Sequence, residues 1–205
     1  VTYVGRLDRG RHLRAFFACL YFAGLRPAEA LGLRVQDCHL PESGWGRLVI
    51  SKSKPQANKR WTDSGETHDD RGLKHRAQDE GRPVPIPPEL VAILREHIEE
   101  FGVHDDGRLF RTGRGGVISI GTYCEAWKAA RVLALTPEQV ASPLAARPYD
   151  LRHAAVSLWL NAGVPAPDVA ERAGHSVDVL LKVYAKCIDG GTEIANQRID
   201  HALSP

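Results

Sequence analysis

The segment from Pro148 to Cys187 reads PYDLRHAAVSLWLNAGVPAPDVAERAGHSVDVLLKVYAKC, and its pattern sets the fold class of the chain. Apolar residues recur in it at the spacing of short amphipathic helices. Gly163 and Gly174 stand where a glycine in the left-handed conformation ends a helix, and Ser176 has the side chain of a helix N-cap. The segment therefore predicts consecutive short helices over residues 152–162 and 168–173 and from Ser176 through Tyr184.

Helical and strand patterns also occupy the rest of the chain. The β-branched, alternating residues of Gly46–Ile50 predict a strand. Arg82–Ile86 predicts a second strand, which we place at a sheet edge because its prolines cannot donate backbone hydrogen bonds. The other expected helices begin near Asp8, Pro27, Glu89, Gly121, Pro137 and Thr192, and the first of them ends at Gly24. These elements predict one domain over residues 1–205, a mostly helical α+β fold with a small antiparallel β-sheet.

The composition is that of an ordinary globular protein and argues against several classes of function. A net charge of +2 and a pI near 8.4 do not by themselves indicate a nucleic-acid binder. No segment approaches the roughly 20 apolar residues that span a membrane, so we expect a soluble, cytoplasmic protein without membrane contact. The cysteines are far apart and form no CxxC pair, which argues against a zinc site and a disulfide framework.

Two arginines, a histidine and a tyrosine are the residue types that phosphodiester cleavage by a phenol requires. The non-bridging oxygens gain charge in the transition state, and the planar guanidiniums of Arg26 and Arg152 can contact them in a bidentate way. The leaving 5′ hydroxyl needs a proton from a general acid such as a lysine or a histidine, and His175 is the histidine of this set. Tyr184 is the candidate nucleophile. Its 3′-phosphotyrosyl intermediate would conserve the bond energy, so we expect no metal, ATP or other cofactor.

Each of these residues also has a purely structural interpretation. A histidine such as His175 can simply cap a helix, and a tyrosine such as Tyr184 can be a core residue with a satisfied hydroxyl. An isolated arginine is usually a surface ion-pair partner, an interpretation that we keep for Arg34, Arg47 and Arg95. We interpret the four tryptophans, Trp45, Trp61, Trp127 and Trp159, as packing residues. A DNA contact stays open for Trp61, which lies in the long polar stretch from Ser51 to Gly81.

Two blocks of sequence resemble the signature of the tyrosine recombinases, the phage-integrase family. GLRPAEALGLRVQD, residues 24–37, is similar to the block around the family's first arginine, with Arg26 in that position and Glu29 as its acidic partner. The motifs DLRHA, AGH and VYA carry Arg152, His175 and Tyr184 in the family's order, with the same nine-residue step from histidine to tyrosine. The resemblance covers nearly the whole chain, as a catalytic domain.

Two positions of the family's catalytic set, a histidine and a lysine, match this chain less directly. The family usually has a histidine three residues before the second arginine, whereas this chain has Tyr149, whose phenol can donate a hydrogen bond but is a poor base near neutral pH. The family's catalytic lysine precedes a strand that resembles RPVPIP, and Lys74 in GLKHRA is the best match to it. Lys52 and Lys54, which follow the first strand, remain alternatives.

The resemblance implies a site-specific DNA recombinase, or integrase, from a bacterium or phage. Its partners would be double-stranded DNA at attachment sites and further copies of the chain, four protomers on two duplexes. It also implies an N-terminal DNA-binding module, which we expect upstream because the chain begins at Val1 and contains no methionine. Two other functions stay open: a type IB topoisomerase, which shares the chemistry, and a catalytically silent DNA-binding remnant of a mobile element, suggested by Tyr149.

Overall fold

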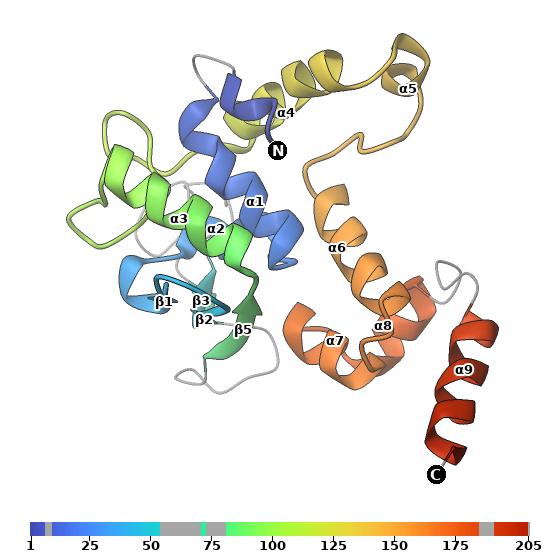
Figure 1. The fold of residues 1–205 in the computed structure, drawn as a ribbon. Coiled ribbons are helices and arrows are strands. Elements are labelled where there is room, and N and C mark those ends of the chain that lie inside the picture. The colour runs from blue at the N-terminus through green and yellow to red at the C-terminus, as the bar shows by residue number, and fades with distance from the viewer. Residues whose placement is uncertain (7–9, 54–70, 73–80, 185–190, 205) are drawn as a thin grey trace. The chain divides into compact units, whose positions relative to one another are not determined.

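The chain forms two compact units, Val1–Ala155 and Val156–Pro205, in a computed structural model that describes residues 1–6, 10–53, 71–72, 81–184 and 191–204 (Figure 1). The boundary between the units falls inside helix α6 (Asp150–Asn161), so one helix contributes to both. Among the described residues, no helix has both the length and the apolar composition needed to cross a membrane.

The first unit combines helices with short strands. Its helical elements are η1 (Val4–Arg6), η2 (Arg11–Leu13), α1 (Arg14–Phe22), α2 (Pro27–Gly32), η3 (Val35–Asp37), α3 (Pro88–Phe101), α4 (Ile120–Ala134) and α5 (Pro137–Ala141). Its strands are β1 (Cys38–His39), β2 (Gly46–Ile50), β3 (Lys52–Ser53), β4 (Arg71–Gly72) and β5 (Arg82–Ile86).

Local sequence signals explain where the helices of this unit begin and end. Gly24 follows α1 with a φ of 59°, a left-handed conformation that glycine adopts without strain, and Pro27 is the first residue of α2, both as predicted. Ser119 caps α4, because its hydroxyl accepts the backbone N–H of Thr122. The first helix begins later than expected, after the 3₁₀ turn η2, and Asp8 lies outside the described residues.

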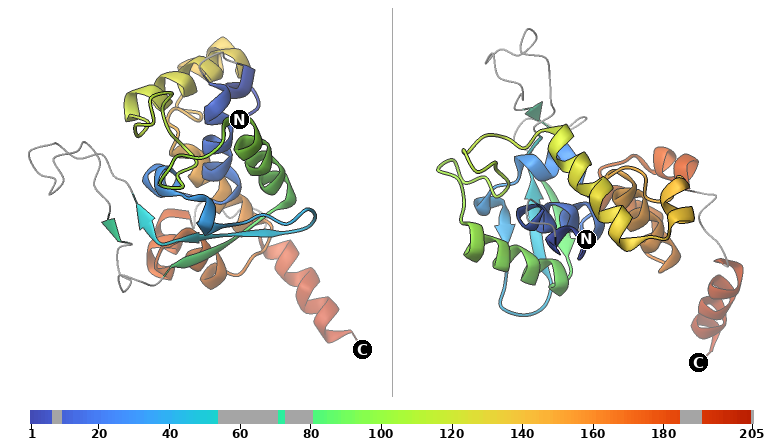
Figure 2. Two further views of the ribbon diagram at one scale, coloured as in Figure 1. Left: turned by 90° about the vertical axis from the view of Figure 1, so that its left-hand side faces the viewer. Right: turned by 90° about the horizontal axis from the view of Figure 1, so that it is seen from above.

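The predicted strands Gly46–Ile50 and Arg82–Ile86 are present with the predicted bounds and pair with each other antiparallel (Figure 2). Three strands hydrogen-bond in the order β1-β2-β5, so β5 lies at an edge of this described sheet, as its prolines indicated. Residues of both strands alternate between buried and more exposed positions, and Leu48 stands opposite Val84 on the buried face. The short strands β3 and β4, which were not predicted, form a second antiparallel pair.

Aromatic residues from distant parts of the first unit form its core. The Phe16 ring of α1 lies 5.2 Å from the Phe17 ring, 5.8 Å from the Phe110 ring and 5.2 Å from the Tyr123 ring, measured between centroids. Helices α1 and α3 lie side by side (Figure 1) and bury their apolar faces in the same cluster as the inward residues of β2 and β5. This continuous core fixes α1, α3 and the sheet relative to one another.

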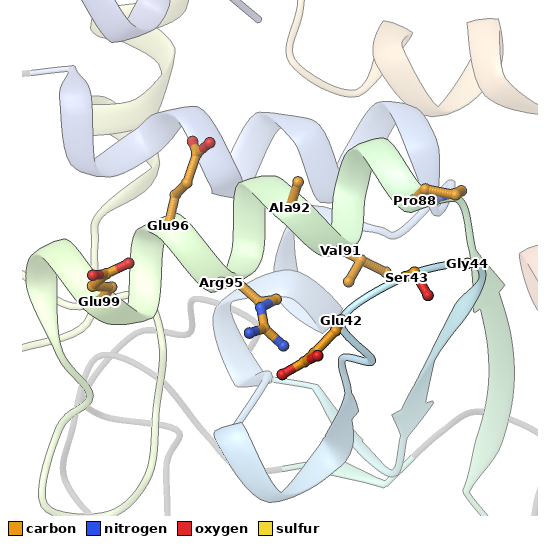
Figure 3. Close-up of a pocket in the computed structure, with 9 residues that line it drawn as sticks. All are labelled: Glu42, Ser43, Gly44, Pro88, Val91, Ala92, Arg95, Glu96 and Glu99. Carbon is orange, nitrogen blue, oxygen red and sulfur yellow. The ribbon is translucent and has the colours of Figure 1, made fainter.

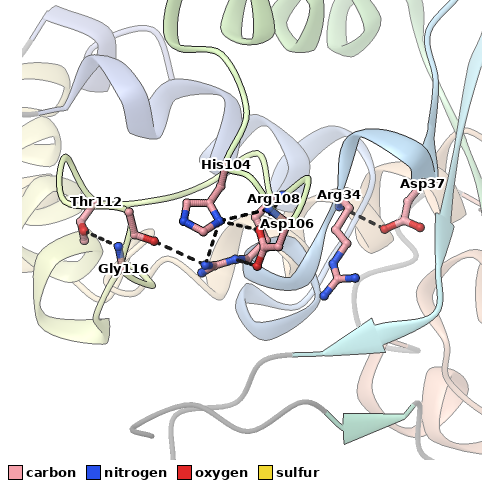
Figure 4. A network of polar contacts seen from close by, with 8 residues as sticks. Arg34, Asp37, His104, Asp106, Arg108, Thr112 and Gly116 are labelled. Carbon is pink, nitrogen blue, oxygen red and sulfur yellow. Dashed lines mark hydrogen bonds and ion pairs between the residues drawn. The ribbon is translucent and has the colours of Figure 1, made fainter.

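A polar network organises the loop between α3 and α4 (Figure 4). The Asp106 carboxylate accepts the backbone N–H of Arg108 at 3.1 Å and its Nε–H at 2.6 Å, and contacts the His104 Nδ1 at 2.8 Å. Partial burial opposes ionisation of Asp106, but these hydrogen bonds outweigh it and hold the pKa of the carboxyl below its ordinary value. The network therefore stabilises the loop with Asp106 ionised.

The second unit contains the short helices that the segment from Pro148 to Cys187 predicted, followed by the helix expected near Thr192. Gly163 and Gly174 end α6 and α7 (Ala166–Ala173) with φ angles of 78° and 63°, in the left-handed conformation expected of them. Ser176 accepts the backbone N–H of Val179 at 3.3 Å at the start of the next helix. The core of this unit contains residues from three helices, Val156, Leu160, Val169, Ala170, Ala173, Leu180 and Tyr184. Its helices besides α6 are α7 (Ala166–Ala173), α8 (Val177–Tyr184) and α9 (Gly191–Leu203).

The tryptophan prediction is wrong for one residue. Trp45, in the turn before β2, is 61% exposed and packs into no core. Trp127 is buried, with its Nε1–H donated to the Ala145 carbonyl at 2.8 Å, and Trp159 packs against the core of the second unit, so both are packing residues as predicted. Trp61 lies outside the described residues. Trp45 is exposed because its place in this turn puts it outside the core clusters that the described residues form.

Because His97 is buried, we expect the free energy of unfolding to fall on acidification. Burial lowers the pKa of His97, whose Nε2 lies 3.0 Å from the Leu109 carbonyl oxygen. Because the unfolded chain then binds a proton more readily than the folded chain, this contribution is complete above about pH 6.5 and is lost as the pH falls below that value. His97→Gln keeps a donor for Leu109 but takes up no proton. Its free energy of unfolding, measured by chemical denaturation across this range, should depend less on pH than that of the parent.

His39→Gln is the matched control, because it removes a histidine from an exposed position on β1. An equal pH dependence for His97→Gln and the parent would show that His97 does not carry the effect.

Candidate active site

Arg26 and Glu29 form an ion pair at the start of α2. Arg26 occupies the N-cap position with an extended backbone, and its N–H donates to Glu29 Oε2 at 2.9 Å. The Arg26 Nη1 donates to Glu29 Oε1 at 2.8 Å. The Glu29 side chain is only 2% exposed, whereas that of Arg26 is 36% exposed. The buried carboxylate therefore holds both the backbone and the guanidinium of an arginine that still reaches the surface.

Arg82 is a second arginine that forms an ion pair with Glu29, and the sequence patterns did not single it out as a functional residue. Its Nη2 lies 2.9 Å from Glu29 Oε2, and the Arg82 side chain is 1% exposed. Arg82 is the first residue of β5, on the same inward face as Val84 and Ile86. That position was the available signal, because a cation at an inward strand position requires a buried partner.

Arg152 belongs to the same unit and is fully buried in the first turn of α6. Its Nη1 donates to the carbonyl oxygen of Gly24, at the entrance to α2. Burial and the neighbouring charge of Arg26 lower the pKa of Arg152 to about 10, although Glu29 acts in the opposite direction. Arg152 therefore remains a cation at neutral pH, but at an electrostatic cost that a nearby anion would reduce.

The side chains of Arg26, Glu29, Arg82 and Arg152 together carry more positive than negative charge. Burial by itself raises the pKa of Glu29, but Arg82, Arg26 and Arg152 together with the Arg26 N–H bring it below its ordinary value. Glu29 is thus ionised and offsets one of the three arginine charges. We call these four residues the arginine cluster, and its excess positive charge suits it to bind an anion such as a phosphate.

Tyr149 stands immediately before α6 and close to the arginine cluster. It favours the charged form of Arg152, and its ring lies 5.1 Å from the His153 ring in an edge-to-face arrangement. Burial lowers the pKa of His153, so this imidazole is neutral at physiological pH. The structure therefore places the tyrosine that replaces the expected histidine next to an arginine of the predicted set.

His175 and Tyr184 lie together in the second unit. Their ring centroids are 6.3 Å apart, with the ring planes at 68°. The His175 N–H donates to the Ala170 carbonyl at 2.9 Å, just after the left-handed Gly174 has ended α7. Tyr184 is the last residue of α8 and is 2% exposed in the core of this unit. The short turn between α7 and α8 thus brings the predicted histidine close to the predicted nucleophile.

The predicted lysine is the part of the set that the structure does not describe. Lys74 and its alternative Lys54 lie outside the described residues, and Lys52 is in β3. In the part of the chain that is described, no group of three or more histidine, cysteine or carboxylate side chains could hold a metal ion.

A pocket of about 280 Å³ in the first unit is lined by none of the predicted site residues that the structure describes (Figure 3). It lies between α3 and the turn that joins β1 to β2. Among its described lining residues, the acidic ones are Glu42, Glu96 and Glu99 and the basic one is Arg95. Because this lining is mainly acidic, the pocket disfavours a phosphate, and the arginine cluster is the better candidate site.

Comparison with known proteins gives consistent relatives. A tyrosine recombinase XerC from Bradyrhizobium diazoefficiens is 26% identical over 176 residues, which cover 83% of this chain and 44% of that protein. A tyrosine recombinase XerC-like protein from Caldanaerobacter subterraneus subsp. tengcongensis is 23% identical over 201 residues, which cover 88% of this chain and 47% of that protein. The chain thus spans about half the length of the curated relatives it matches.

Solved structures confirm the predicted fold class. The Tn1549 transposon integrase in complex with circular intermediate DNA has a TM-score of 0.74 at 17% identity, over 97% of this chain and 63% of that one. The catalytic domain of bacteriophage HP1 integrase has a TM-score of 0.56 at 17% identity, over 96% and 86% of the two chains. Residues 8–189 also match the profile described as the phage integrase family. The chain therefore belongs to the phage integrase family, the family of the tyrosine recombinases.

Proposed function

We propose that this chain is the catalytic part of a site-specific DNA recombinase that breaks and rejoins strands through a 3′-phosphotyrosyl intermediate. The observation that carries the proposal is the arginine cluster, where three buried or half-buried guanidiniums surround one carboxylate. Its residues Arg26 and Arg152 stand at the arginine positions of the family's motifs. The names of the relatives, recombinases and integrases, support the same activity.

Arg26 and Arg152 bind the scissile phosphate in this proposal. Both guanidiniums can donate two parallel hydrogen bonds to non-bridging oxygens, whose charge increases as the phenol attacks. A bound phosphate also compensates the burial and the repulsion from Arg26 that lower the pKa of Arg152. Tyr149, next to Arg152, donates a further hydrogen bond from its phenol rather than acting as a base.

Tyr184 attacks the phosphorus, and the bond from phosphorus to the 5′ oxygen breaks. The phenol proton leaves as the new ester bond forms, and a general acid protonates the departing 5′ hydroxyl. We assign the general acid to Lys74 and a hydrogen bond to the phosphate to His175. Because Arg152 and Tyr184 are both buried, DNA binding must rearrange the chain around each of them.

The proposed partners are double-stranded DNA at attachment sites and three further copies of the protein. Exchange between two duplexes cuts four strands, and each covalent attachment uses one tyrosine, so four protomers supply one nucleophile each. The energy of the broken bond is kept in the phosphotyrosine, so a 5′ hydroxyl from the other duplex can reverse the step without ATP. Solved structures of the Tn1549 integrase and of XerH bound to difH contain DNA, which supports a DNA partner.

Tyr184→Phe should abolish covalent attachment to DNA, because phenylalanine lacks the attacking oxygen. The protein that contains this chain would be incubated with nicked duplexes whose sequence around the nick is random. Cleavage next to the nick releases a short fragment that carries the new 5′ hydroxyl, and its loss traps the phosphotyrosine. Covalent complexes would then be isolated on denaturing gels and their DNA sequenced. We expect adducts with the parent, enriched in one sequence, and loss of adduct to background with Tyr184→Phe.

Tyr21→Phe, in the half-buried part of α1, is the matched control and should form adducts like the parent. Adducts without any sequence preference would indicate a topoisomerase-like enzyme. Adducts that persist in Tyr184→Phe, or a parent that forms none, would contradict the proposal.

Glu29→Gln should destabilise the protein by about 3–5 kcal/mol, because the buried arginines lose their anionic partner. Added sulfate, which mimics the scissile phosphate, should restore part of this loss by binding to the arginine cluster. Chemical denaturation with and without sulfate measures both effects. Asp106→Asn, which removes a more exposed carboxylate, should cost about 1 kcal/mol or less and show no larger response to sulfate than the parent. A response to sulfate that is equal in all three proteins would argue against an anion site here.

A further inference from the structure

The Glu29 carboxylate connects an arginine that reaches the surface to one that does not. Oε1 accepts Nη1 of Arg26, and Oε2 accepts the Arg26 N–H and contacts Nη2 of Arg82 at 2.9 Å. Both oxygens of one carboxylate are therefore in use. The rotation of the Glu29 side chain determines where the Arg26 guanidinium lies, and Arg82 is the contact that comes from a different element of the fold.

Arg26 holds Glu29 only locally. Arg26 is the N-cap of α2 and Glu29 lies three positions later, so the contacts between them belong to the start of one short helix and do not connect Glu29 to the rest of the fold. Arg82 is anchored independently, because β5 pairs with β2 along its whole length and Arg82 stands opposite Ile50 in that register. Its guanidinium therefore holds the Glu29 carboxylate at a fixed position relative to the sheet.

The burial of the two arginines separates their roles. Arg26 is 36% exposed and Arg82 is 1% exposed in side-chain terms. Arg82 Nη2 lies 2.9 Å from Glu29 Oε2 within the core, on the inward face of its strand. The exposed guanidinium of Arg26 can meet a DNA phosphate directly. Arg82 differs from Arg152, which is also buried, because Arg82 Nη2 lies 2.9 Å from Glu29 Oε2 and therefore acts on that carboxylate.

We infer that Arg82 is a positioning residue for strand cleavage: it fixes the Glu29 carboxylate, which in turn orients the Arg26 guanidinium on the scissile phosphate. The inference rests on the proposed function, since it assigns the phosphate contact to Arg26. Arg82 itself touches neither DNA nor the reacting atoms. Its loss therefore affects the reaction through the placement of Arg26, where an error of about 1 Å can slow a reaction up to about 100-fold.

Arg82→Met tests this role in single-turnover cleavage of a nicked duplex selected by the parent protein. Two substrates are compared, one with the natural scissile phosphate and one in which a methylphosphonate replaces a charged oxygen by a methyl group. We expect Arg82→Met to cleave the phosphate substrate at least about 10-fold more slowly than the parent. On at least one methylphosphonate isomer the defect should be much smaller, because that substrate needs less charge stabilisation from Arg26.

A purely structural role predicts a different result, in which Arg82→Met slows both substrates by the same factor, and that result would overturn the inference. Arg82→Lys carries the test if Arg82→Met does not fold. It keeps the positive charge but replaces the planar guanidinium by a single ammonium, so it should show a smaller defect with the same dependence on substrate. Arg47→Met, an exposed arginine on the neighbouring strand β2, is the control and should cleave like the parent.

A double-mutant cycle tests the route through Glu29. If Arg82 acts by fixing that carboxylate, Glu29→Gln combined with Arg82→Met cleaves no more slowly than the slower single variant. A rate defect of the double variant that equals the product of the two single defects would instead mean that Arg82 acts independently of Glu29. A parent that forms no Tyr184 adduct contradicts the proposed function, whereas a parent that cleaves and an Arg82→Met variant that cleaves equally well contradict only the positioning role.

Discussion

The ionised carboxylate of Glu29 is the constraint on which the candidate site depends. Three guanidiniums gather in and around the core of the first unit, and without an anion among them their mutual repulsion and lost hydration would oppose folding. Glu29 compensates one of these charges and binds Arg26 and Arg82 directly. The charge that remains is available to a phosphate. Stability and the proposed function thus rest on the same group: the carboxylate offsets the repulsion among the arginines and leaves the cluster positive.

The rest of the first unit serves to bring this cluster together. Arg26 and Glu29 come from α2, Arg82 comes from β5, and Arg152 comes from the first turn of α6. The core that contains Phe16, with the antiparallel pairing of β2 and β5, fixes the elements that carry the first three of these residues. The hydrogen bond from Arg152 to the Gly24 carbonyl ties the fourth to the entrance of α2.

Sequence patterns located the elements best where the physical signal is local. The strands Gly46–Ile50 and Arg82–Ile86 have the predicted bounds, because alternating burial and proline placement act within a few residues. Glycines in the left-handed conformation ended the C-terminal helices where expected, for the same reason. The exposure of Trp45 and the pairing of β3 with β4 were missed, because both depend on what lies nearby in space and not on neighbours in sequence.

The sequence by itself determined the fold class, the family and the residue types of the proposed chemistry, because the motifs around Arg26, Arg152 and Tyr184 are contiguous and carry their own spacing. It also paired Arg26 with Glu29, since residues three positions apart at the start of a helix are neighbours. Only the tertiary structure decided that Arg82 shares this carboxylate. A strand residue and a helix residue so far apart in the chain meet because sheet register and core packing place them there, and no local pattern encodes that contact.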